Sequence, residues 1–199
     1  MLKRTLTFAL LFLGLKSAHV HATQVLNLDL EALCNRSSAV VLASVLKVAS
    51  ERIPGTQTII TRIELGVDED WTTARPGWKP LRRLTIQQLG GVADGIETTV
   101  IGMPRFVVGQ RALLFVRTDA GTSPQSPEAR FGVVGMMQGF RPLFRDAVSG
   151  HWMVMPSDKS EAVHPNNNRV ANIDPGTEAI LRVDELKGRV VKLLGMRKP

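Results

Sequence analysis

Short apolar runs, separated by turns, are the feature that most constrains how this chain can fold. Val, Ile, Leu and Phe recur in these runs, and Gly, Pro, Asn or Asp lie between them. Such runs are typical of β-strands, because β-branched and aromatic side chains pack well on a pleated sheet. The expected strands are residues 39–48, 58–65, 81–89, 111–117, 130–137, 143–145 and 151–155. The pattern therefore predicts a mainly β fold.

Helical patterns are confined to the two ends of this series. A short helix is expected to end near Asn35, with Asn27 or Asp29 as its cap. A longer apolar stripe with helical spacing follows Thr177 and ends at Gly195. Helices at the ends and few, long strands between them favour a small antiparallel Greek-key barrel, similar to the oligonucleotide/oligosaccharide-binding (OB) fold, over an immunoglobulin-like sandwich.

Four segments follow from these patterns. We expect a signal peptide at residues 1–22, the β-barrel domain at 23–156, a polar linker at 157–176 and a C-terminal helix at 177–195 docked on the barrel. The barrel region shows no internal repeat and no boundary before Ser157.

The N-terminal segment has the parts of a secretory signal peptide in order. Lys3 and Arg4 come first, an apolar stretch runs from Leu6 to Leu15, and small residues precede a cut after Ala22. An uncleaved anchor is the alternative, but a spanning helix needs roughly 20 apolar residues, and Lys16 interrupts the run before that length. We therefore expect a periplasmic or secreted protein with no membrane span after cleavage.

The charge of the expected mature chain is modest. Three of the 25 Lys and Arg residues lie in the signal peptide and none of the 18 acidic residues does, which leaves 22 against 18, or +4 in place of +7. The basic residues are scattered and aromatic residues are few, with no Tyr and three Trp. A nucleic-acid surface needs clustered charge, and a single-strand binder needs stacking aromatics. Nucleic acid is therefore not the expected partner.

Ligands for a metal or cofactor are scarce in this chain. Cys34, His151 and His164 are its only Cys and His residues after the signal peptide, and their spacing matches no zinc site. One cysteine also excludes an internal disulfide, and its place on the apolar face of the first helix favours a buried structural thiol. We expect no metal, no cofactor and no catalytic set.

The long loop between the strands at 81–89 and 111–117 is rich in glycine. Function often lies on such loops of β scaffolds, but no helix follows and no Gly-Lys-Ser/Thr is present, so it is not a phosphate-binding loop. Arg and aromatic side chains dominate protein interfaces, which suggests Arg105 and Phe106 as anchors. The equally weighted alternative is that Phe106 closes the barrel core and Arg105 is a surface charge. The predicted partner-binding residues are Gly90, Gly91, Arg105, Phe106 and Gln138.

A longer pattern spans more than half of the expected mature chain. Its parts are Val40–Val45, Gly90-Gly91, Gly102–Gly109, Leu113–Val116 and Val133–Phe140. The stretch from Leu30 to Phe140 resembles a group of uncharacterised exported bacterial proteins, a likeness that implies export and no particular activity.

The general shape is also similar to the netrin/tissue-inhibitor type of OB-like module, which includes metalloprotease inhibitors. Those inhibitors bind zinc through an amino-terminal cysteine. This chain would begin at Thr23 and has its only thiol at Cys34, so that inhibitory residue is not carried over.

Three functional hypotheses remain. The leading one is an exported, non-catalytic binding module for a protein or envelope component, with an exported protease as one candidate and the oligomeric state open. The second is an envelope hydrolase that uses Asp94, Glu97 or His151. The third is a basic OB-type nucleic-acid binder, whose affinity would fall steeply with salt.

Overall fold

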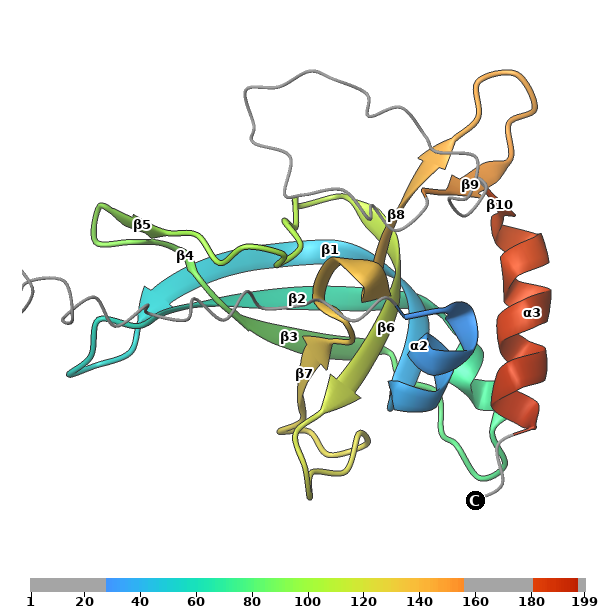
Figure 1. Ribbon diagram of the computed structural model, residues 1–199, viewed down its shortest axis with the longest axis horizontal. Coiled ribbons are helices and arrows are strands. Elements are labelled where there is room, and N and C mark those ends of the chain that lie inside the picture. The colour runs from blue at the N-terminus through green and yellow to red at the C-terminus, as the bar shows by residue number, and fades with distance from the viewer. Residues whose placement is uncertain (1–27, 156–180, 197–199) are drawn as a thin grey trace, which may run out of the picture.

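The computed structural model describes residues 28–155 and 181–196 (Figure 1). The strands are β1 (Ala39–Arg52), β2 (Ile59–Asp70), β3 (Arg83–Leu89), β4 (Gly91–Ala93), β5 (Ile96–Thr98), β6 (Arg111–Thr118), β7 (Arg130–Val133), β8 (Phe140–Arg145), β9 (Trp152–Val154) and β10 (Leu181–Arg182). The helices are α2 (Leu30–Arg36), α3 (Val183–Gly195) and the 3-10 turns η1 (Trp71–Ala74) and η2 (Met136–Gly139).

Five of these strands close into a barrel. β1 pairs with β2 on one side and with β6 on the other, and the ring continues from β2 through β3 and β7 back to β6. This order confirms the predicted mainly β, OB-like Greek-key barrel. One pair departs from the antiparallel expectation, because β3 and β7 run parallel, joined at Thr85 with Arg130 and at Ile86 with Phe131.

The continuous apolar run of β1 is explained by burial on both of its faces. Val41 and Val45 point into the barrel core, whereas Val40 and Leu42 belong to a second core beneath the helices. A strand covered on both faces loses the alternation of apolar and polar residues that a half-exposed strand shows.

The second core lies between the barrel and an outer layer built from α2, α3 and η1. Leu186, Val190 and Leu194 of α3 are buried there, against Trp71 and Leu113. Figure 1 shows α3 standing along one end of the barrel, with the β8–β9 hairpin above it.

The predicted C-terminal helix is corrected at its start. Leu181 and Arg182 form strand β10, which pairs with Val154 and Met153 of β9, and the helix begins at Val183. Thr177 and the predicted linker at 157–176 lie outside the described residues. None of the described helices combines the length and apolarity that crossing a membrane would need.

The N-terminal helix behaves as the sequence predicts. Asp29 is its cap, and its side chain accepts a hydrogen bond from the backbone N–H of Ala32 at 2.7 Å. Cys34 is 1% exposed, and burial raises the pKa of its thiol to about 11. The predicted burial of Cys34 is confirmed, and a buried thiol that stays protonated is a poor nucleophile.

Two other boundaries differ from the expected ones. The strand predicted at 130–137 ends at Val133, because Gly135 adopts a left-handed conformation with φ 63° and opens η2. The loop expected after residue 90 holds the small β4–β5 hairpin. β1 and β2 also continue together past the end of the β1–β6 pairing, and this part is called the β1–β2 ribbon below. β3 stays paired with the outer side of β2 as far as Ile60, and β1 carries a β-bulge beside Leu46.

Candidate functional site

The predicted Gly90-Gly91 pair has a structural role. Thr61 donates its hydroxyl hydrogen to the carbonyl of Gly90 at 2.6 Å, where the chain leaves β3. Gly91 has φ 126°, and a Cβ atom there would overlap the hydroxyls of Ser50 and Thr61. Only glycine allows so close an approach in this backbone conformation, so the pair lets the chain cross over the β1–β2 ribbon.

The other three predicted binding residues are divided between core and surface. Phe106 is 7% exposed and packs edge-to-face on Phe140, with ring centroids 4.8 Å apart. Gln138 is also buried, and its Oε1 accepts a hydrogen bond from the backbone N–H of Leu28 at 2.6 Å. Arg105 is exposed. Burial thus supports the interpretation of Phe106 as a core residue, and Arg105 is the exposed member of the pair.

The candidate acid–base residues of the hydrolase hypothesis are not brought together. Asp94 and Glu97 lie on the β4–β5 hairpin, where Asp94 forms an ion pair with Arg52 at 3.4 Å. His151 precedes β9 at the other end of the molecule (Figure 1).

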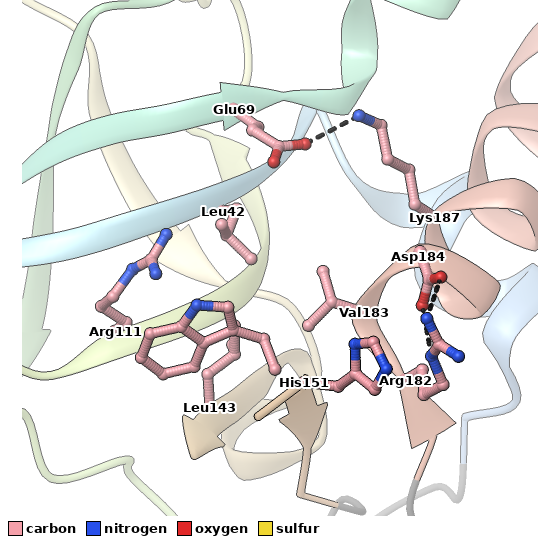
Figure 2. Close-up of a pocket in the computed structure, with 10 residues that line it drawn as sticks. Leu42, Glu69, Arg111, Leu143, His151, Arg182, Val183, Asp184 and Lys187 are labelled. Carbon is pink, nitrogen blue, oxygen red and sulfur yellow. Dashed lines mark hydrogen bonds and ion pairs between the residues drawn. The ribbon is translucent and has the colours of Figure 1, made fainter. Parts of the chain in front are cut away.

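A cleft of about 520 Å³ lies beside the second core, between the barrel and α3 (Figure 2). Residues of β1, β2 and β6 form one wall, and the β8–β9 hairpin, β10 and the first two turns of α3 form the other. The lining residues are Leu42, Glu69, Arg111, Leu143, His151, Trp152, Arg182, Val183, Asp184 and Lys187.

An arginine stacked on a tryptophan forms part of this lining. The Arg111 guanidinium carbon lies 4.6 Å from the ring centroid of Trp152, a distance at which the ring face attracts the cation. The Nε–H of Arg111 also donates to Oδ2 of Asp68 at 3.0 Å, and Ser44 donates to the same oxygen. The stack and the ion pair fix Arg111, while 38% of Trp152 stays exposed.

A second charged pair spans the cleft. Lys187 of α3 donates to Oε2 of Glu69 on β2 at 2.8 Å (Figure 2), and the indole N–H of Trp71 donates to the same oxygen at 3.0 Å. The hydrogen bond from Lys187 is the main cause that lowers the pKa of Glu69. On the outer wall, Arg182 pairs with Asp184 at 2.8 Å. The cleft therefore combines fixed charges of both signs with the apolar side chains of Leu42, Leu143 and Val183.

The lowered pKa of Glu69 predicts an acid-sensitive contribution to stability. Such a carboxyl stabilises the fold above its ordinary pKa of 4.5, and this contribution is lost as the pH falls through the lower folded-state pKa. Because the carboxylate and Lys187 are 43% and 48% exposed, we expect no more than about 1 kcal/mol.

Urea unfolding of wild type and Glu69→Gln across the acid range checks this. The variant should lose less stability on acidification than wild type. Glu64→Gln, at an exposed pair with Lys47 at 3.7 Å, is the control and should follow wild type. Equal acid sensitivity of wild type and Glu69→Gln would show that the pair contributes nothing.

Sequence reasoning missed most of this cleft. Its central residues, Glu69, Arg111, Trp152 and Lys187, are far apart in the chain and share no motif. Of the lining residues, only His151 was a predicted site residue. The acidic run at 68–70 was the one available indication, since β2 ends there and two of its carboxylates hold cations of the cleft.

No protein-family model, curated protein or solved structure matches the chain in the three comparisons made. Within residues 28–155 and 181–196, no cluster of three or more His, Cys, Asp and Glu side chains could hold a metal ion.

Proposed function

We propose that this protein is exported and acts as a non-catalytic binding module, and that its partner docks in the cleft between the barrel and α3. The observation that carries the proposal is the partly exposed Trp152, stacked on Arg111 in the lining of a cleft of about 520 Å³. Trp and Arg are the residue types that most often dominate binding energy in interfaces.

The hydrogen-bonding capacity of this pair supports the choice of site. Within the described residues, the side chain of Arg111 makes one hydrogen bond, from Nε to Asp68, and the indole N–H of Trp152 makes none. The two Nη groups of a guanidinium can bind one carboxylate as a fork. Leu42 and Leu143 supply apolar contact beside them. The chemistry fits a protein or envelope partner that inserts an acidic group next to an apolar one.

The geometry favours binding over the hydrolase hypothesis. General acid–base catalysis needs its groups within hydrogen-bonding reach of one substrate. The β4–β5 hairpin, which carries Asp94 and Glu97, lies at the opposite end of the molecule from β9, which His151 precedes (Figure 1). The cationic groups of the cleft are also paired with carboxylates, whereas a nucleic-acid surface has an unbalanced positive charge.

The proposed export depends on the signal peptide at residues 1–22, which lies outside the described residues. Cleavage after Ala22 would leave Thr23 as the first residue, which mass spectrometry of the protein purified from the periplasm or the medium would show. A full-length chain that retains Met1–Ala22 would contradict it.

The binding test is affinity capture with immobilised residues 23–199, exposed to envelope and secreted fractions of the source organism. One dominant partner should be retained by wild type and lost with the double variant Arg111→Gln, Trp152→Ala. Both side chains lie at the surface of the cleft, so circular dichroism and the melting temperature should stay close to wild type.

Arg105→Gln is the matched control, because it removes one exposed arginine from the loop at 90–109. Retention of the partner by the cleft variant would place binding elsewhere, and loss with Arg105→Gln alone would place it on that loop. No capture at low and moderate salt would contradict the binding function. Capture of nucleic acid with a steep salt dependence would favour the third hypothesis.

A further inference from the structure

β1 extends beyond one of its two neighbours. Its pairing with β6 covers only Ala39–Ser44, and Val45 then exchanges two backbone hydrogen bonds with the turn at residues 107–110. From Lys47 to Arg52, the described residues give β1 a partner on one side only, which is β2. This half of the strand is an open sheet edge, called the β1 edge below. Open edges are ready templates for pairing with another strand.

The hydrogen-bonding phase of the ribbon shows which groups face outward. Ile53 donates to the carbonyl of Thr58, so this pair is hydrogen-bonded across the ribbon. Antiparallel pairs alternate between bonded and non-bonded, which directs the N–H and C=O groups of Val48, Ser50 and Arg52 away from β2. Ile59, opposite Arg52, agrees with this phase, because its carbonyl accepts from Gly90 on the β3 side.

The two faces of the β1 edge differ. The β4–β5 segment covers one face, where Gly91 packs on Ser50 and Asp94 pairs with Arg52. Side chains alternate along a strand, so Lys47, Ala49 and Glu51 lie on the other face, and all three are exposed. A cation, a small residue and an anion therefore follow one another along the open edge.

We propose that the β1 edge pairs antiparallel with the β1 edge of a second copy of this chain, about a twofold axis at Ser50. Ser50 then faces Ser50 of the second copy, and Val48 faces Arg52. The outward N–H and C=O groups of Val48, Ser50 and Arg52 then all have hydrogen-bonding partners in the second copy. The same register brings Lys47 of each copy diagonally next to Glu51 of the other, within reach of long side chains.

Charge complementarity is the argument for a second copy as the occupant. The order Lys47, Ala49, Glu51 is complementary to itself when reversed, so one contact is made twice in a twofold dimer. Lys47 and Glu51 already form ion pairs within the chain, with Glu64 and Arg62. These pairs do not prevent the new contacts, because about half or more of each of the four side chains is exposed.

Exposed apolar residues mark the inner end of the same edge. Leu46 is 46% exposed, and Val107 and Val108 of the adjoining turn are 57% and 62% exposed. That turn blocks pairing at Val45, which limits how far the second strand can slide. In the proposed register Ile53 of the second copy, 36% exposed in the single chain, lies opposite Lys47 and reaches this apolar group.

The dimer goes beyond the proposed function and is independent of it. The cleft is lined by Leu42, in the other half of β1, so pairing of the β1 edge leaves the cleft accessible. Loss of one activity would not remove the other.

Sedimentation velocity of residues 23–199 over a wide range of concentration tests the dimer. Wild type should show a reversible monomer–dimer equilibrium. Lys47→Glu and Glu51→Lys, each alone, place like charges together twice and should raise the dimer dissociation constant about tenfold or more. The double variant Lys47→Glu, Glu51→Lys restores opposite charges between copies and should recover the dimer.

Lys79→Glu makes the same charge change at an exposed site away from the β1 edge, and it should leave the dissociation constant unchanged. Thermal melting of each variant verifies folding. A wild type that is monomeric at every concentration would overturn the proposal. So would a dimer that the single variants do not weaken, or one that the double variant fails to restore.

Discussion

Gly139→Ala is expected to lower the free energy of unfolding by about 3 kcal/mol or more. A Cβ atom at this position would overlap the backbone carbonyl of Val134 and come within 3.0 Å of that of Phe115. The Phe115 carbonyl is held by the sheet, because Phe115 lies in β6 and its carbonyl accepts from the N–H of Val134 at 2.8 Å. The same bond ties the backbone of Val134 to β6. The Phe115 carbonyl cannot move without breaking this bond, so the added methyl group should displace η2 from the barrel.

Gly132→Ala is the matched control for this prediction. Gly132 lies in β7, and a Cβ atom there would meet nothing within 4 Å. Both glycines have negative φ or extended backbone, so the two substitutions differ mainly in steric overlap. Urea unfolding should show the control within about 0.5 kcal/mol of wild type. Equal stability of the two variants would contradict the close packing of η2 on β6.

The sequence predicts the barrel well because strand formation and burial are local properties of the chain. The β-branched runs in β1, β2, β3 and β6 lie where the pattern expects them. The pairing of β1 with β6, which closes the ring, is expected from the barrel fold class and not from any particular residue. No local sequence pattern predicts the parallel pairing of β3 with β7. The number and order of the strands therefore predict the topology of the barrel. They do not predict which residues of neighbouring strands pair.

Boundaries fail where tertiary contacts outweigh local preference. The run at 130–137 is apolar enough for a strand, but Gly135 turns the chain into η2 so that Gln138 can bind the backbone of Leu28. Leu181 fits the apolar stripe of the C-terminal helix, yet it pairs with Val154 as part of β10. Each choice depends on a partner more than 25 positions away in the sequence.

The site is harder to predict than the fold for the same reason. Phe106 looks like an interface anchor in a Gly-rich loop, and only the neighbouring ring of Phe140 shows that it belongs to the core. Trp152 and Arg111 are unremarkable in sequence, and stacking makes them a candidate site. The charge order of Lys47 and Glu51 is visible in the sequence, but its meaning depends on the open edge beside it.

Leu186→Ala should produce the second large loss of stability, about 2–4 kcal/mol. Leu186 is 1% exposed and lies in the second core with Trp71 and Val190. Truncation removes apolar contact and leaves a cavity between α3 and the barrel, which the rigid sheet cannot fill. Because Lys187 and Asp184 of the same helix line the cleft, weaker docking of α3 should also weaken partner capture, by the fraction of molecules in which the helix is undocked.

Met196→Ala is the control at the end of the same helix. Met196 is 65% exposed, so its truncation should change the free energy of unfolding by less than about 0.5 kcal/mol and leave capture unchanged. Urea unfolding gives both free energies, and the slope with denaturant shows whether α3 unfolds with the barrel or before it. A Leu186→Ala variant as stable as Met196→Ala would mean that α3 contributes little to the folded state. The cleft would then lack a fixed outer wall, because Val183, Asp184 and Lys187 reach it only when the helix is docked.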